Sequence, residues 1–282
     1  MEHKGKLFLC ATPIGNLGDV SQRFVTTVEE ADVIAAEDTS HSRKLLSHIG
    51  VSKKLVSYHE HNKDKRGQEL IDMLLAGQTV ALLSDAGHPG ISDPGEQLVA
   101  MAVKEGISIV PIPGASAVLC AVMVSGLEST PFFFGGFLPK TKKHRREKLR
   151  MWQSIPATIV LYEAPHRIKE VVKDIFEVWG DRRIAIAREL TKVYEEFFRG
   201  SVAESLCWLE ENTPRGEFTL VIDKDKDAAS ELERPPAMEK LKELIASGED
   251  KKESLKKIAK EYNIPKRDLY KQLLEQESAG GM

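Results

Sequence analysis

Short apolar runs recur through the first 113 residues, and amphipathic stretches such as Gly67–Ala76 and Gly95–Glu105 lie between them. The runs are too short for buried helices and are bounded by turn residues, so they predict β-strands. Strands that alternate with helices predict a mostly parallel α/β sheet, whose ligand site lies at the carboxyl ends of the strands. The predicted strands are Leu7–Ala11, Val33–Ala36, Leu55–Ser57, Val80–Ser84 and Ile107–Pro111.

The middle third of the chain has more short apolar runs and fewer long helices. Helices are predicted at Ile168–Trp179 and Leu206–Asn212. This pattern predicts a second α/β domain with a mixed sheet, and we place the two domains at residues 1–113 and 114–224. The strand candidates are Phe132–Leu138, Thr158–Tyr162, Ile184–Ala187, Glu195–Arg199 and Phe218–Ile222.

A charged segment, residues 225–236, ends in two prolines and predicts a linker to a helical tail at residues 237–282. Apolar residues at helical spacing lie on both sides of a turn at Ile264 and Pro265. Two helices joined by a short turn predict a helix-turn-helix. A plain helical hairpin that packs on the body or on a dimer partner fits the pattern equally well. The apolar positions are Leu255, Ile258, Ala259, Tyr262, Leu269, Tyr270 and Leu273.

Composition places the chain among globular proteins, with 41% hydrophobic and 29% charged residues and a net charge of −3. A nucleic acid would therefore need a local basic patch. The scattered cysteines Cys10, Cys120 and Cys207 predict buried thiols in a reducing compartment. Because no signal peptide and no long apolar run is seen, we expect a cytoplasmic protein without a membrane partner.

The Gly/Pro-rich loop Ser84–Gly95 is the densest candidate for ligand binding. Its three glycines and two prolines fix an unusual backbone path, and Asp85 and Asp93 give it negative charge. A cation or an amine suits such a loop better than a pyrophosphate, and the chain has no Walker A or G-x-G-x-x-G motif and no visible zinc site. The alternative is a rigid turn in which Asp93 caps the helix that follows.

The loop at residues 113–117 offers the amides of Ser116 and Ala117 to the same ligand, or forms a hinge between the domains.

Acids and imidazoles follow other predicted strands. Acid–base catalysis or substrate binding would use such groups, and ordinary hydrogen bonding within loops is the alternative. The candidates are Glu37, Asp38, His59, Glu60 and Glu163.

The segment Lys140–Arg150 holds seven Lys or Arg residues against one acid. Such a patch contacts phosphates and predicts RNA or another polyanion as partner, with a solvated helix face as the alternative. Together with the YEAPHR motif it gives the RNA-binding candidates Lys140, Lys142, Lys143, Arg145, Arg146 and Arg167.

Nine ordered segments resemble the RsmI group of ribosomal RNA small-subunit methyltransferases, within the tetrapyrrole methylase superfamily. The resemblance covers about residues 5–224, and the tail is similar to the helix-turn-helix domain of many members. Ser40, His88, Ala115 and Ala164 depart from the expected Arg, Thr, Pro and Ser. The segments are LFLCATPIGNLGD, AAEDTS, SYHEHN, LLSDAGHPGISDPG, PIPGASA, GGFLPK, YEAPHR, ARELTK and RGEFTLVI.

The resemblance implies a tetrapyrrole methylase-like fold that binds S-adenosylmethionine in a cleft between two α/β domains. It also implies 2′-O-methylation of a cytidine ribose in the decoding region of 16S rRNA, a homodimer, and no DNA partner. A methylase of small tetrapyrroles and a non-catalytic RNA-binding module are the alternatives. The donor-site residues carried over from the motifs are Pro13, Asp85, Gly87, Ile91, Ser92, Asp93, Ser116, Ala117, Tyr162 and Gly216.

Overall fold

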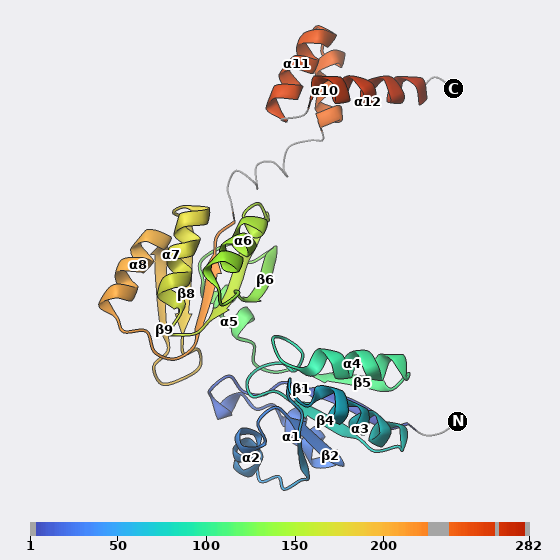
Figure 1. Cartoon of the computed structure of the whole chain (residues 1–282), viewed down its shortest axis with the longest axis vertical. Coiled ribbons are helices and arrows are strands. Elements are labelled where there is room, and N and C mark those ends of the chain that lie inside the picture. The colour runs from blue at the N-terminus through green and yellow to red at the C-terminus, as the bar shows by residue number, and fades with distance from the viewer. Residues whose placement is uncertain (1–3, 225–236, 263–264, 280–282) are drawn as a thin grey trace. The chain divides into compact units, whose positions relative to one another are not determined.

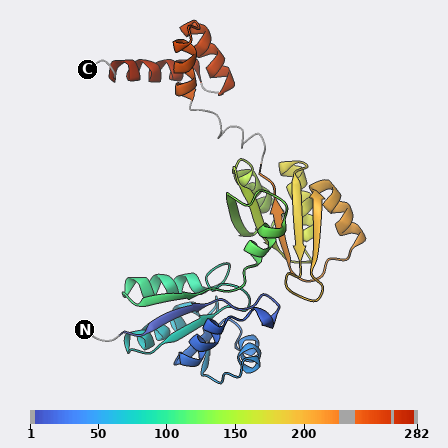
Figure 2. The ribbon, with the colours of Figure 1, turned by 180° about the vertical axis from the view of Figure 1, so that it is seen from behind.

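A computed structural model describes residues 4–224, 237–262 and 265–279 (Figures 1 and 2). Both α/β sheets belong to one compact unit, which runs to Asp223 apart from residues 154–156. The C-terminal helices belong to a second unit. The linker predicted at residues 225–236 lies outside the described residues, and the domain limits stay predictions.

The first sheet is fully parallel, with the strand order β3-β2-β4-β1-β5. The N-terminal strand β1 is internal and pairs with β4 on one side and β5 on the other. The predicted parallel α/β sheet is therefore confirmed. The strands are β1 (Lys6–Cys10), β2 (Val33–Ala36), β3 (Leu55–Ser57), β4 (Val80–Leu83) and β5 (Ser108–Ile112).

Alternate residues of these strands pack on opposite faces of the sheet. Ile34 and Leu83 join a core with Phe24 and Leu45, from the helices of one face. Leu82 joins another core with residues of α3 and α4, on the other face. Strands buried on both faces read as continuous apolar runs, which is why they could be located from sequence. The helices are α1 (Gln22–Glu30), α2 (Thr39–His48), α3 (Lys63–Leu75) and α4 (Gly95–Lys104), with a short 3-10 turn at Leu17–Asp19.

The second sheet is mixed, with the strand order β6-β7-β10-β8-β9. β6 and β7 are parallel, whereas the other neighbours are antiparallel. The predicted mixed sheet is confirmed. Its strands are β6 (Phe132–Phe137), β7 (Thr158–Glu163), β8 (Arg183–Arg188), β9 (Glu196–Ser201) and β10 (Phe218–Ile222), and the helices around it are α5 (Ala117–Val124), α6 (Lys142–Trp152), α7 (Ile168–Trp179) and α8 (Val202–Glu211).

In its described residues, the C-terminal unit has three helices that share a small apolar core. Leu241, Leu255, Ile258, Leu269 and Leu273 form this core. The predicted helical tail is confirmed, although the predicted turn at Ile264 lies outside the described residues. The helices are α10 (Ala237–Ala246), α11 (Lys251–Glu261) and α12 (Lys266–Ala279).

The thiols differ from the sequence prediction. Cys10 is buried within the first sheet, and its burial raises the pKa of the thiol to about 12. Cys120 is half-buried and Cys207 is exposed on α8, so the prediction that all three thiols are buried is wrong.

None of the described helices is both long and apolar enough to cross a membrane.

Candidate functional site

The loop Ser84–Gly95 is held in place by the loop that follows β1. The backbone amide of Thr12 donates to the Gly87 carbonyl at 2.8 Å, and the Gly87 amide donates back to Thr12 at 3.1 Å. The Ser84 hydroxyl also donates to the Gly87 carbonyl. Gly87 and Gly90 have φ angles of +79° and +83°, which side chains rarely adopt. The glycines therefore set the path of this loop at the carboxyl edge of the first sheet.

A cavity of about 450 Å³ opens beside this loop and is lined by loops that follow strands of the first sheet and by residues of the second sheet. This volume is within the range of small-molecule sites. Aromatic and aliphatic side chains form much of the wall, and carboxyl groups lie among them. The lining residues are Ile14, Glu37, Asp85, Ala86, Gly87, His88, Ile91, Ser92, Asp93, Ser116, Ala117, Phe137, Tyr162, Glu163, Ala164, Pro165, Leu190, Glu217, Phe218 and Thr219.

The structure brings most of the predicted donor-site residues together at this cavity. All of them line it except Pro13 and Gly216, whose chain neighbours Ile14 and Glu217 line it instead. Sequence reasoning missed Leu190 and Phe218, although both lie in motifs that the resemblance quoted. Their signal was available in ARELTK and RGEFTLVI, but nothing in the local pattern shows which residue of a motif faces a cavity.

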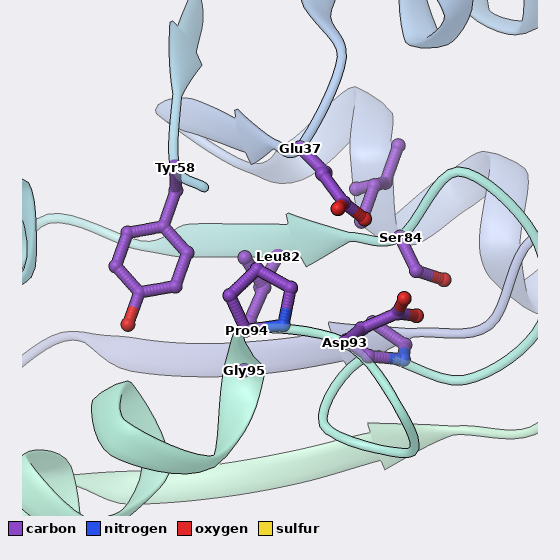
Figure 3. Close-up of a pocket in the computed structure, with 9 residues that line it drawn as sticks. Glu37, Tyr58, Leu82, Ser84, Asp93, Pro94 and Gly95 are labelled. Carbon is purple, nitrogen blue, oxygen red and sulfur yellow. The ribbon is translucent and has the colours of Figure 1, made fainter. Parts of the chain in front are cut away.

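Two carboxyl groups of this wall, those of Glu37 and Asp93, interact directly, and each changes the pKa of the other. Figure 3 shows both side chains turned toward the same small recess, next to Ser84. Burial, the negative charge of Glu37 and that of Asp85 raise the pKa of Asp93 to about 7. Burial and the charge of Asp85 also raise the pKa of Glu37. Asp93 does not cap the helix that follows, because α4 has no side-chain hydrogen bond at its N-cap.

Glu163 lies at the end of β7 and is almost fully buried, with 2% of its surface exposed. Its Oε1 accepts from the amide of Ala164 at 2.8 Å and lies 3.5 Å from the Arg167 guanidinium. Its Oε2 has no hydrogen-bond partner. Burial raises the pKa of this carboxyl, while the Ala164 amide and Arg167 oppose that rise. An unpaired buried oxygen at a cavity wall leaves an acceptor, or a proton donor, for a ligand.

The remaining acid–base candidates do not line the cavity. Asp38 caps α2 by accepting from the amides of Ser40 and His41, which lowers its pKa. Glu60 is 67% exposed and pairs with Lys63 at 2.6 Å. His59 bonds to Asn62 through its amide and its Nε2, and its charge acts on Glu37. Glu37 and Glu163 are therefore the candidates that the structure places at the cavity.

The basic helix α6 is only partly available to a polyanion. Arg145 is 2% exposed, and its Nε donates to Asp174 of α7 at 2.6 Å. The prediction that Arg145 binds RNA is corrected, because the guanidinium is buried and already neutralised. Arg146 also pairs with Asp174, at 2.6 Å, and with Glu177. Arg167 donates to the carbonyls of Leu138 and Pro139.

Three of the six predicted RNA-binding residues, Lys140, Lys142 and Lys143, have exposed side chains. They lie at the start of α6 and just before it. Phe137, which lines the cavity and is 55% exposed, precedes them in the chain. The first exposed cation, Lys140, therefore lies three residues after a residue of the cavity wall.

With this geometry established, the chain was compared with known proteins. Residues 6–205 match the profile of the family described as Tetrapyrrole (Corrin/Porphyrin) Methylases. The chain belongs to this family. It is a methyltransferase, and S-adenosylmethionine is its methyl donor.

Relatives with established names match over nearly the whole chain. A protein of Halalkalibacterium halodurans named Ribosomal RNA small subunit methyltransferase I is 48% identical, over 95% of this chain and 94% of its own. Proteins of the same name from Synechocystis and Bacillus subtilis are each 44% identical, over 98% and 94% of this chain and over 100% and 93% of their own.

Solved structures support the fold at lower identity. A diphthine synthase superposes with a TM-score of 0.62 at 16% identity, covering 80% of this chain and 94% of its own. Uroporphyrin-III C-methyl transferase from Thermus thermophilus, in complex with S-adenosyl homocysteine, superposes with a TM-score of 0.57 at 16% identity over 77% of this chain and 97% of its own.

The residues at the cavity fit S-adenosylmethionine. The ligand carries a sulfonium cation and an ammonium group, and Asp85 supplies a partly exposed carboxylate at the cavity. Tyr162, Leu190 and Phe218 add aromatic and aliphatic surface to the wall, against which an adenine ring would pack. In the described part of the chain, no cluster of His, Cys, Asp and Glu is placed to hold a metal ion.

Proposed function

We propose that the chain transfers the methyl group of S-adenosylmethionine to the 2′-oxygen of a cytidine ribose in the decoding region of 16S rRNA. The observation that carries the proposal is the 48% identity, over 95% of the chain, to a relative named for methylation of small-subunit ribosomal RNA. The choice of cytidine, of the 2′-oxygen and of the decoding region rests on the motif resemblance.

The site supports transfer to an RNA in two ways. The cavity is large enough for the donor, and its wall ends at Phe137, close in the chain to Lys140, Lys142 and Lys143. Cations at this position contact the phosphates on either side of a target nucleotide.

Bound S-adenosylmethionine supplies a methyl group on a positively charged sulfur, which is a good leaving group for in-line displacement. Among the residues that line the cavity, Asp85 would pair with the positive charge of this donor when it is bound, and the loop at Gly87 forms part of the wall. Apolar side chains exclude water, and alignment of the two reacting groups accounts for a large share of the rate. Carboxyl groups at the cavity remain to take up the proton of the attacking hydroxyl.

A direct test offers the enzyme two acceptors with methyl-labelled S-adenosylmethionine. We expect label in small ribosomal subunits that lack the modification, and none in a porphyrinoid. Nuclease digestion and mass spectrometry should identify the product as 2′-O-methylcytidine. Label in the porphyrinoid alone, or on a base of the RNA, would contradict the proposal.

Charge reversal of Lys142 and Lys143 together is expected to weaken RNA binding by about tenfold or more, because both phosphate contacts are lost. The slope of log affinity against log salt should become shallower by about two, one unit for each lost contact. The measurement is RNA affinity at several salt concentrations. Reversal of the exposed Lys44 and Lys104, on α2 and α4, serves as the matched control. An unchanged salt slope in the Lys142/Lys143 variant would exclude these residues from the RNA interface.

The homodimer implied by the resemblance is part of the proposal. Helix α5 packs one side on the second sheet and exposes 57% of Leu119 and 77% of Met123 on the other. Exposed apolar side chains of this kind are typical of contacts between subunits.

A further inference from the structure

Glu37 and Asp93 come from different elements and meet at one cavity. Glu37 directly follows β2, and Asp93 lies near the end of the loop Ser84–Gly95. Their carboxyl groups interact directly, and each changes the pKa of the other. Figure 3 shows the two side chains converging on the recess beside Ser84. Both residues also line the 450 Å³ cavity of the donor.

A second observation indicates that this wall is built for a ligand. Glu163 lines the same cavity from the other sheet, is 2% exposed, and leaves its Oε2 without a partner. The acids of the cavity are therefore not all satisfied by contacts within the protein, and a ligand that donates hydrogen bonds would complete them.

We propose that Glu37 and Asp93, which line one recess of the cavity, act as a carboxyl pair that takes up the proton of the attacking ribose hydroxyl during methyl transfer. This inference rests on the function proposed above. Under this inference Asp93 accepts a proton instead of binding S-adenosylmethionine, and Asp85 is the carboxylate that would pair with the sulfonium.

The step balances in atoms and charge. The bond between the ribose oxygen and the methyl carbon forms while the bond between that carbon and sulfur breaks, and its electron pair stays on sulfur. The hydroxyl proton passes to the proton-free carboxyl pair and is held between Glu37 and Asp93, until water accepts it. The sulfur loses one positive charge while the carboxyl pair gains one, so the total charge of the site is unchanged.

The charges around the pair keep it basic enough for this role. Asp85 after β4 and Asp38 at the start of α2 raise the pKa of Glu37, whereas His59 after β3 lowers it. Glu37 and Asp85 raise the pKa of Asp93, which also acts on Tyr162 of β7. A base whose pKa lies near 7 combines a large ionised fraction at neutral pH with a strong affinity for the proton.

The test compares Glu37→Gln, Asp93→Asn and the double variant with wild type. Each single change is expected to lower kcat/KM for methyl transfer by about 100-fold or more, in the range of general base catalysis. Because the two groups act as a unit, the double variant should be about as slow as either single one.

In wild type kcat/KM should fall as the pH is lowered through about 7, where Asp93 takes up its proton. In either single variant this fall should move to lower pH, because the neighbouring negative charge is gone.

Two readouts are independent of activity. Binding of S-adenosylmethionine at pH 7 should release a fraction of a proton, because the sulfonium favours the ionised pair, and binding of neutral S-adenosyl homocysteine should not. Calorimetry in buffers of different ionisation enthalpy measures this release, which should disappear in Asp93→Asn.

Thermal unfolding should show Asp93→Asn to be more stable than wild type above pH 7, since the raised pKa of Asp93 makes its ionisation unfavourable to the folded state.

Glu30→Gln and Asp72→Asn, both exposed, serve as matched controls and should leave every readout unchanged. A variant that loses rate while its pH profile and proton release stay as in wild type would overturn the proposal, as would single variants that keep more than a third of the rate. Methylation of a base by the wild-type enzyme would refute the proposed function, whereas the proton-release measurement would still decide whether the pair exists.

Discussion

Asp174→Ala is expected to destabilise the fold by about 3–5 kcal/mol, the cost of removing one partner of a buried ion pair. Asp174 and Arg145 are each 2% exposed, and the carboxylate of Asp174 accepts from both Arg145 and Arg146. Its removal leaves the Arg145 guanidinium buried, with only the Lys140 carbonyl and a long contact to Glu170. Urea unfolding followed by circular dichroism measures the loss.

Glu177→Ala is the matched control for this prediction. Glu177 lies on the same helix α7 and also pairs with Arg146, but it is 36% exposed. Exposed ion pairs contribute about 0–1 kcal/mol, so this variant should unfold close to wild type. A loss below about 1 kcal/mol in Asp174→Ala would mean that the buried pair does not stabilise α6 against α7.

Gly95→Ala is expected to weaken binding of S-adenosyl homocysteine by about tenfold or more, which corresponds to about 1.4 kcal/mol. A Cβ atom at this position would lie 2.6 Å from the amide nitrogen of Gly90 and 3.1 Å from the carbonyl carbon of Pro89. Both contacts are to backbone, so the loop Ser84–Gly95 must move. Ile91, Ser92 and Asp93 would move with it, away from the cavity. Isothermal titration calorimetry measures the affinity.

The matched control is Gly67→Ala on α3. Its Cβ would meet the sulfur of Met101 at 3.3 Å, and this sulfur belongs to a flexible side chain that can turn away. Alanine within a helix is more favourable than glycine by about 0.5–1 kcal/mol, so the protein should be as stable as wild type or more so. Affinity within twofold of wild type in Gly95→Ala would show that the loop is not needed for donor binding.

The strands could be predicted to within one or two residues because their signal is local. Val33–Ala36 is a continuous apolar run and Phe218–Ile222 is apolar except at Thr219, and the structure reproduces the limits of both. Helix starts were harder: α8 begins at Val202, four residues before the predicted Leu206, because Ser201 and Glu204 form a capping box there. That motif was present in the sequence, and the apolar spacing alone did not reveal it.

The site was predictable as a set of loops but not as a set of contacts. The Gly/Pro density at Ser84–Gly95 predicted a ligand loop, and the structure places residues of this loop at the cavity. The pairing of Asp93 with Glu37 depends on β2 and β4 being neighbours, which no local pattern specifies. The burial of Arg145 likewise depends on Asp174, which lies far away in sequence on another helix.

The central position of β1 also affects how the protein is made. Lys6–Cys10 is synthesised before the other strands of its sheet, yet both of its partners, Val80–Leu83 and Ser108–Ile112, are translated much later. Until Ile112 has left the exit tunnel, the nascent chain carries an apolar segment with an unpaired edge, and such segments aggregate easily. The growing polypeptide is therefore expected to need chaperone cover at its N-terminus for most of the synthesis of the first sheet.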